Sequence, residues 1–259
     1  TPIALCMALP AAAQTSVTSS RTTVSTSTVN NGAADDVIIE AGGSVDLGLQ
    51  PGAGVRIDSD NDVTNHGIIG SFDAPNSIGI VADGHRSHIS NDGMIELFAG
   101  LPTMDADGDG DLDGPFATGR SRIGISITAS SGSLNNVGRI RVFGNESAGI
   151  DVSGFQGDIS TSGGIDVIGD SSYALRLTNI DGSVHLGGSI SVKGGESSAI
   201  FIDGAVSGTV TLDGDISATG YRYTDPSAAS VDTSQLDGDD LLIGGPAVAI
   251  GASVGGGVA

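Results

Sequence analysis

The chain has 259 residues, a formal net charge of −21 and an aromatic content of only 3%. With 10 basic residues against 31 acidic ones, it lacks the basic surface that nucleic acid or an anionic membrane requires, which argues against both as partners. The simplest interpretation of the charge is the solubility and self-repulsion of a secreted protein, and capture of divalent cations is the alternative. There is no Trp, and 42 residues are Gly, as expected for a chain that turns often around a core of small aliphatic side chains.

The first 13 residues resemble the end of a secretory signal peptide. An apolar run from residue 3 is followed by small residues, and cleavage is expected after Ala13. The single cysteine, Cys6, lies in this run, so the mature chain would contain none. No stretch reaches the ~20 apolar residues of a spanning helix. We therefore expect an exported protein with no membrane insertion by this segment.

Residues 14–36 are rich in Ser and Thr, with Val17, Val24 and Val29 at irregular intervals. We interpret this segment as an extended or poorly ordered lead-in. Its expected role is to cover the first open coil of the structure that follows, because terminal repeats of stacked proteins need caps.

From residue 37 to residue 259 the chain repeats itself, with the clearest copies 25 residues apart. The first apolar positions of four successive units are Ile125, Ile150, Leu175 and Ile200. Each unit holds three short alternating apolar segments separated by turn formers, which predicts three strands. Three strands per 25 residues form one coil of a parallel β-helix. We predict a right-handed all-β solenoid of about six to seven coils, the hand following from the bias of parallel crossovers.

Alternation also assigns each side chain to the interior or the surface. The predicted outward column of the first strand is Arg56, Val81, Ser126, Asp151, Arg176, Phe201 and Ala249. Since rungs lie ~4.8 Å apart, opposite charges would stack as Asp151–Arg176 and, on the third strand, as Glu96–Arg141–Asp166. We interpret this surface as a solvated face; a binding surface is the alternative.

Three asparagines, Asn65, Asn91 and Asn136, occupy equivalent positions near the end of the second strand. Buried amides need hydrogen-bond partners, and stacked amides can serve one another. The spacing therefore predicts an asparagine ladder, which further along gives way to Thr161, Leu186 and Leu212.

Two insertions, 101–120 and 221–244, interrupt the repeat at the same corner of the coil. The first contains alternate acidic residues, Asp105, Asp107, Asp109, Asp111 and Asp113. With Gly110 in sixth place, they match the front of a calcium loop, because Ca²⁺ takes six to eight oxygen ligands. Phe116 replaces the usual twelfth-position glutamate, so an acidic loop without metal is the alternative. We expect ligand contacts on this flank, with residues 221–240 as the other lip.

The sequence contains only incomplete patterns for a histidine metal site and for paired catalytic carboxylates. His85 and His88 form an H-x-x-H pair without a third ligand, which favours a solvated loop. No two carboxylates stand on neighbouring first-strand rungs, which argues against a hydrolase or lyase site there. We therefore expect no catalytic residues.

Residues 63–69 and 89–95, read with the ending 241–258, resemble rungs of the passenger domains of bacterial autotransporters. The resemblance implies a passenger displayed on the cell surface or released from it, a structural or adhesive scaffold that contacts a surface ligand or neighbouring cell. It also implies that a C-terminal β-barrel follows Ala259 and that this chain is a truncated fragment. A secreted carbohydrate-active β-helix enzyme is the main alternative. A calcium-folded secreted protein is a third, suggested by the single nonapeptide-like copy at 238–245.

Overall fold

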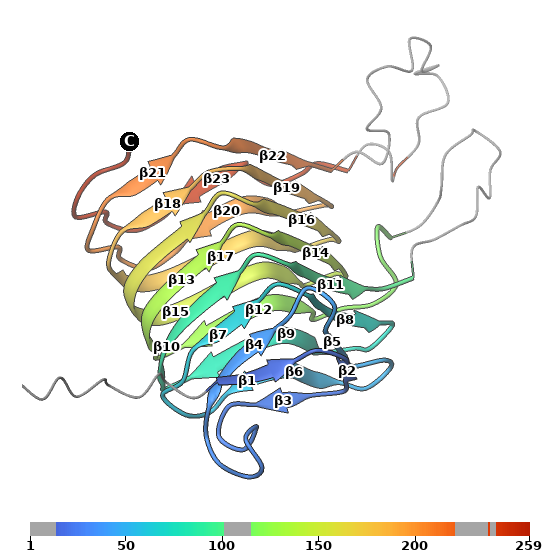
Figure 1. Ribbon diagram of the computed structural model, residues 1–259. Coiled ribbons are helices and arrows are strands. Elements are labelled where there is room, and N and C mark those ends of the chain that lie inside the picture. Colours follow the sequence, from blue (N-terminus) through green and yellow to red (C-terminus); the bar gives the residue numbers. More distant parts are fainter. Residues whose placement is uncertain (1–13, 101–114, 221–237, 239–241) are drawn as a thin grey trace, which may run out of the picture.

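The computed structural model describes residues 14–100, 115–220, 238 and 242–259, and all 23 elements assigned there are strands (Figure 1). They form a 15-stranded sheet, here sheet A, and an eight-stranded sheet, here sheet B. No helix in this part of the chain is long and apolar enough to cross a membrane.

Each coil contributes a first and a second strand to sheet A and a third strand to sheet B. The first strands are β3 (Val24–Ser25), β6 (Gly52–Ile57), β9 (Ser77–Asp83), β12 (Ile123–Thr128), β15 (Ala148–Thr161), β17 (Tyr173–Asp181), β20 (Ser198–Ile202) and β23 (Val248–Ile250). The second strands are β1 (Gln14–Val17), β4 (Asp36–Ile39), β7 (Val63–Asn65), β10 (Arg86–Asn91), β13 (Ser131–Asn136), the end of β15, β18 (Val184–Leu186) and β21 (Val210–Leu212). The third strands are β2 (Ser20–Arg21), β5 (Ser44–Asp46), β8 (Ile68–Phe72), β11 (Met94–Phe98), β14 (Arg139–Phe143), β16 (Gly164–Ile168), β19 (Ser189–Lys193) and β22 (Asp215–Thr219).

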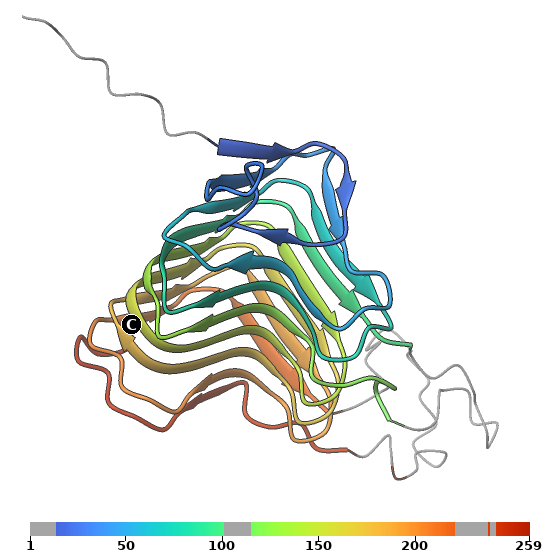
Figure 2. The same cartoon turned by 90° about the horizontal axis from the view of Figure 1, so that it is seen from below.

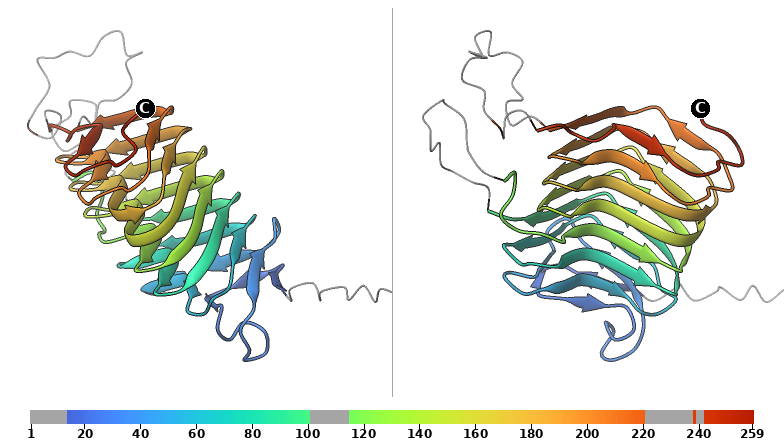
Figure 3. Two further views of the ribbon diagram at one scale, coloured as in Figure 1. Left: turned by 90° about the vertical axis from the view of Figure 1, so that its left-hand side faces the viewer. Right: turned by 180° about the vertical axis from the view of Figure 1, so that it is seen from behind.

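Every ladder between these strands is parallel. The prediction of a parallel β-helix is therefore confirmed, with about eight coils rather than six to seven. Figure 2 shows successive coils following the same outline, and both views of Figure 3 show them stacked in sequence order.

The core is a stack of aliphatic columns, as the alternation predicted. The two central inward residues of each first strand, from Val55 and Ile57 to Ile200 and Ile202, are at most 1% exposed. Val248 and Ile250 in β23 are only partly buried, because β23 pairs with β20 alone among the described strands. Burying each such side chain stabilises the fold by roughly 1.5–3 kcal/mol. Because each rung covers the side chains of the next, every rung depends on its neighbours for stability.

Residues 14–36 were expected to be an extended or poorly ordered lead-in that covers the first open coil; they contain three extended strands that lie on the next coil and form a coil of their own. Within residues 14–36, the strands β1, β2 and β3 pair with β4, β5 and β6 and form the first coil. The period is irregular here: Val17 pairs with Ile39, whereas Val24 pairs with Val55. This irregularity hid the coil from a search for a 25-residue period.

The asparagine ladder is present, and all three amides are fully buried. Asn65 donates from Nδ2 to Oδ1 of Asn91 at 2.7 Å, and Asn91 donates likewise to Asn136 at 2.7 Å. Asn136 then donates to the hydroxyl of Thr161 at 3.1 Å. The ladder thus ends where the sequence places Leu186 and Leu212, which cannot accept a hydrogen bond.

A second ladder, of serines, lies at the corner before the first strand. The backbone N–H of Arg122, Ser147 and Ser172 donates to the hydroxyl one coil further on, at 3.0–3.1 Å. Each hydroxyl donates in turn to a carbonyl of its own turn; for Ser147 this is the carbonyl of Asn145, at 2.9 Å. The 25-residue spacing of Ser147, Ser172 and Ser197 was visible in the sequence, but it gave no sign that these side chains are buried.

Asp58 fastens the first coil to the rest of the stack. Its carboxylate accepts hydrogen bonds from the Ser25 hydroxyl at 2.7 and 2.8 Å and from the backbone N–H of Ser27 at 2.9 Å. Burial raises the pKa of Asp58, but these hydrogen bonds, with one from Thr26, outweigh it and hold the pKa below its ordinary value of 3.8. Asp58 therefore stabilises the fold mainly in its ionised form.

We expect Asp58→Asn to loosen the first coil at neutral pH, seen as faster amide hydrogen exchange in β1–β3. A group with a lowered folded-state pKa stabilises above its unfolded pKa, and this contribution is lost as pH falls through the folded value. The difference between the parent and the variant should therefore shrink as the pH falls below about 3.8. Asp83→Asn, at an exposed position of β9, is the matched control and should leave the first coil unchanged. A pH-independent difference would contradict the assignment.

Candidate functional site

The two insertions leave the same corner of the coil, as predicted. Each lies between a third strand and the next first strand: β11 and β12 in one case, β22 and β23 in the other, four rungs apart. Gly100 and Thr118, at the two ends of the first insertion, are hydrogen-bonded at 2.8 and 3.1 Å, so this insertion begins and ends at one point. Most of both insertions, and the expected ligand-binding flank they would form, lies outside the described residues.

The calcium ligands predicted from the sequence, Asp105, Asp107, Asp109, Asp111 and Asp113, also lie outside the described residues. Within the described part of the chain, no group of three His, Cys, Asp or Glu side chains is placed to hold a metal ion. Calcium binding by the first insertion therefore stays a prediction.

We expect calorimetry to detect calcium binding to the whole chain at millimolar Ca²⁺ or below. Changing Asp107 and Asp109 to Ala removes two carboxylate ligands and should abolish the heat. Changing Asp158 and Asp181 to Ala, two carboxylates elsewhere on the solenoid, is the control and should leave it unchanged. No heat from the parent chain would refute the prediction.

His85 and His88 do not converge. Nδ1 of His85 lies 3.4 Å from Oδ1 of Asp60, whereas Nδ1 of His88 lies 2.8 Å from the hydroxyl of Ser133. Each imidazole is thus engaged with a different neighbouring rung. This arrangement agrees with the interpretation of the H-x-x-H pair as a solvated loop.

The predicted stacks of opposite charge are present on the outer surface. Arg176 donates from Nε and Nη2 to the two carboxylate oxygens of Asp151, at 3.0 and 2.5 Å. On sheet B, Nη1 of Arg141 lies 3.3 Å from Glu96, and its Nε lies 3.9 Å from Asp166. The bidentate pair with Asp151 raises the pKa of Arg176 still further, so the guanidinium stays charged.

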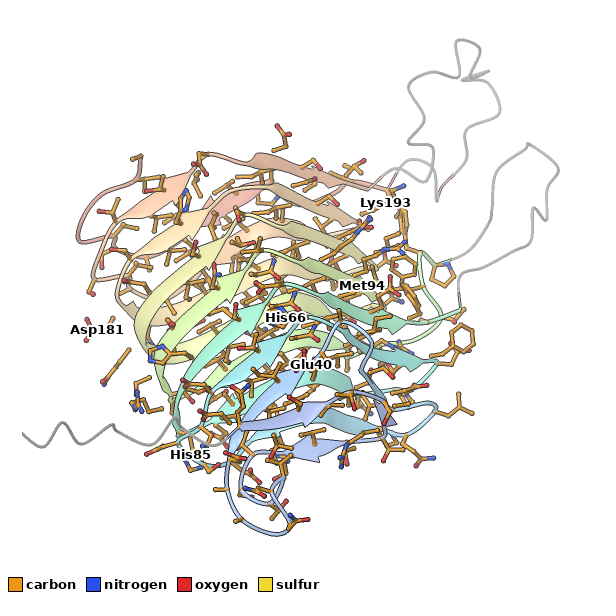
Figure 4. The ribbon with its side chains drawn as sticks, viewed as in Figure 1. Glu40, His66, His85, Met94, Asp181 and Lys193 are labelled. Atoms are coloured by element: carbon orange, nitrogen blue, oxygen red, sulfur yellow. The ribbon has the colours of Figure 1, made fainter. Side chains whose placement is uncertain are left out.

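A groove with a volume of about 890 Å³, here the sheet B groove, lies on the outer face of sheet B. It runs along the solenoid, and the residues that line it, from Ala41 to Ser191, belong to successive rungs. His66 and Met94 lie on the side of the molecule that faces the viewer in Figure 4. The sequence identified which residues point outward. It did not show the groove, whose depth depends on where bulky outward side chains give way to small ones.

Glycines at one corner of successive coils make room for this groove. Gly67, Gly93 and Gly138 stack at the turn before the third strand and line the hollow. A Cβ on Gly138 would lie 2.1 Å from the carbonyl oxygen of Gly93, and one on Gly93 would lie 2.3 Å from that of Gly67. Neighbouring rungs come so close together here that only a hydrogen atom fits in place of a side chain. No side chain therefore covers the groove at these positions.

One wall of the groove is the first outward column of sheet B. The register aligns Ile68, Met94, Arg139, Gly164 and Ser189 on successive rungs. The column therefore begins with large side chains and ends with small ones. Ile68 is 49% exposed, and Val137, on the adjoining turn, is 53% exposed.

A column of aromatic rings lies at the far ends of the same strands. Phe72 pairs in register with Phe98, whose ring lies 4.8 Å from that of Phe143. The guanidinium of Arg141 lies 5.2 Å from both of these rings. Phe72 is 61% exposed and lines a second hollow of about 230 Å³ that shares Ile68 with the sheet B groove. Three of the six phenylalanines thus lie on this outer face rather than in the core.

A smaller hollow of about 250 Å³ lies against the first strands and brings together two carboxylates, Glu146 and Asp151. Tyr173 and Arg176 also line it, and the Tyr173 ring stacks on that of Phe201 at 5.3 Å. Sequence reasoning missed this pair, because it compared carboxylates on neighbouring rungs and not on a turn and the strand that follows it.

In comparisons with protein-family models, curated proteins and solved structures, nothing matches the chain. The chemical assignment of these surfaces therefore rests on the geometry of the β-helix and its outward residues.

Proposed function

We propose that the chain is an exported passenger of a bacterial autotransporter, displayed at the cell surface or released from it, where it serves as a structural and adhesive scaffold. The β-helix is consistent with this role, since its interior is filled by packed side chains and its work must be done on outer surfaces. The resemblance of residues 63–69 and 89–95 to passenger rungs supports the same assignment.

The outer face of sheet B is the feature that supports the proposed adhesive role. An acidic chain is expected to cover itself with solvated charge, yet this face has a long groove and exposed Ile68, Phe72 and Val137. Exposed apolar side chains that gather beside polar ones mark interaction sites. A surface of this kind suits contact with a partner outside the cell.

The test expresses the complete reading frame that contains this chain in a Gram-negative host. We expect protease added to intact cells to remove the solenoid, and we expect expressing cells to aggregate or adhere more than cells carrying an empty vector. A solenoid that stays inside the cell, or cells that display it without any gain in contact, would overturn the proposal. Calcium on the first insertion, and a β-barrel encoded beyond Ala259, belong to the same proposal.

A carbohydrate-active enzyme is a second candidate, favoured by the hollow that holds Glu146 and Asp151. Paired carboxylates flank the scissile bond in most glycosidases. Here, however, both oxygens of Asp151 are held by Arg176, and Glu146 lies 3.7 Å from Arg120. Turnover in a panel of polysaccharides, abolished by Asp151→Ala and by Glu146→Gln, would establish this candidate in place of the scaffold.

A further inference from the structure

We propose that the sheet B groove binds an uncharged glycan, whose chain lies along the solenoid axis across successive rungs. This inference rests on the proposed adhesive function and names the chemical class of the ligand. Its support comes from the polar groups of the groove, its apolar wall, its charge balance and its repeat.

The polar groups of the groove suit hydroxyl-rich ligands. Arg139 donates hydrogen bonds, Asp166 accepts them, and the hydroxyl of Ser189 does both. The hydroxyl of Ser191 already donates to Oδ1 of Asp166 at 2.9 Å, which leaves it as an acceptor. Arg139 forms no ion pair with any described residue, so its guanidinium is available to a ligand. A sugar hydroxyl both donates and accepts, and neighbouring hydroxyls on one ring can use donors and acceptors on adjacent rungs.

The apolar groups suit the carbon-bound hydrogens of a pyranose ring. Ile68 and Val137 lie in the groove wall, and Phe72 with Phe98 lines the adjoining hollow on the same face. Binding pockets generally combine such apolar surface with a few oriented polar groups. Aromatic side chains contribute a large contact area at low conformational cost.

The charges favour an uncharged glycan over an acidic one. On this face, from β5 to β22, the three basic residues are outnumbered by acidic ones, so no excess of positive charge remains to attract an anion. The basic residues are Arg139, Arg141 and Lys193, and the acidic ones are Asp46, Glu96, Asp166 and Asp215. The chain as a whole carries −21, which repels polyanions over longer distances. A glycan without charge does not need positive groups in the groove and is not repelled by the net negative charge of the protein.

A peptide strand fits the groove less well than a glycan. Peptides that bind β-proteins commonly add a strand to a sheet edge through free main-chain groups. Along the groove these groups are already engaged: the carbonyls of Gly67 and Gly93 accept from Met94 and Arg139, both at 2.9 Å. The backbone groups in the floor of the groove are therefore already hydrogen-bonded, and a ligand can contact only side chains there.

The repeat of the solenoid suits a polymer. Successive rungs present the next member of each outward column every ~4.8 Å. This spacing is close to the length of one sugar unit in an extended chain, so each unit meets an equivalent position on the next rung. Several weak contacts then add along one ligand.

The experiment uses the whole chain with Ile68→Trp, which places a single Trp in the groove of a protein that has none. We expect a saturable fluorescence change with at least one of four uncharged hexasaccharides, built from glucose, mannose, galactose or N-acetylglucosamine. Calorimetry on the unaltered chain should give the same preference. No saturable binding of any of the four at millimolar concentration would overturn the proposal, as would binding confined to uronic-acid polymers.

Four substitutions test whether the ligand binds in the groove. Arg139→Ala and Phe72→Ala should each weaken binding roughly two- to tenfold, and Ser189→Phe, which fills the groove at an exposed position, should abolish it. Phe201→Ala removes an outward aromatic from sheet A and should leave the affinity unchanged. Melting temperatures of all four confirm that they fold. Equal losses from Phe72→Ala and Phe201→Ala would contradict the assignment.

The two proposals can fail separately. Cells that gain adhesion from a chain that binds none of the four sugars would leave the scaffold standing and refute the glycan. A chain that binds a glycan but is never exposed on cells would leave the groove standing and refute the surface role.

Discussion

Replacing Asn91 by Ala is expected to lower the free energy of unfolding by about 2–5 kcal/mol. Asn91 is the middle member of the buried ladder, and its loss leaves Oδ1 of Asn136 without its 2.7 Å donor. Nδ2 of Asn65 loses its 2.7 Å acceptor and keeps only the longer hydrogen bond to the Met94 carbonyl, at 3.3 Å. Each buried polar group left unpaired costs about 1–3 kcal/mol, and the lost side chain leaves a cavity as well. Denaturant unfolding followed by circular dichroism measures the loss.

Asn135→Ala is the matched control for this change. Asn135 lies next to Asn136 on β13, but its side chain points outward and is exposed. Its replacement should alter the free energy of unfolding by no more than about 0.5 kcal/mol. If the two variants unfolded at the same denaturant concentration, the ladder would not be the stabilising element that its geometry indicates.

Replacing Gly138 by Ala is expected to be the other severe change, with a loss of about 3 kcal/mol or more. The added Cβ would lie 2.1 Å from the carbonyl oxygen of Gly93, well inside van der Waals contact. This carbonyl cannot move freely, because it accepts a 2.9 Å hydrogen bond from the backbone of Arg139. Overpacking of this kind typically costs 1–3 kcal/mol, and more where the backbone itself must shift.

Gly42→Ala serves as the control for Gly138→Ala. Gly42 is exposed, and a Cβ built on it meets nothing within 4 Å. We expect its unfolding midpoint to match that of the parent. Because Gly138 lines the sheet B groove, Gly138→Ala should also reduce ligand binding, whereas Gly42→Ala should not. Similar midpoints for the two variants would contradict the close approach of the rungs.

Much of the fold could be predicted, because a parallel coil repeats its hydrophobic pattern in the sequence. The expected partners Ile125 and Ile150 pair in register, as do Asp151 and Arg176. The first coil could not be predicted in the same way. β2 and β3 have only two residues each, and such short strands leave no alternation to detect.

The candidate site was less predictable than the fold. Periodicity tells which side chains point outward, but the sheet B groove depends on the absence of side chains at Gly67, Gly93 and Gly138. The column of Phe72, Phe98 and Phe143 was also missed, because the unequal spacing of these residues, 26 and then 45, hides their common position. A search for columns that allows for the insertion 101–120 would have found it.

Contact through the outer face of sheet B can be tested directly on cells that display the chain. The most direct measurement compares the retention of bacteria that display the parent chain, Ser189→Phe or Phe201→Ala on surfaces coated with the four uncharged glycans. If this face is the contact surface, the parent and Phe201→Ala are retained on at least one glycan and Ser189→Phe is not, at equal amounts of displayed protein. Equal retention of all three, or none above cells without the chain, would contradict it.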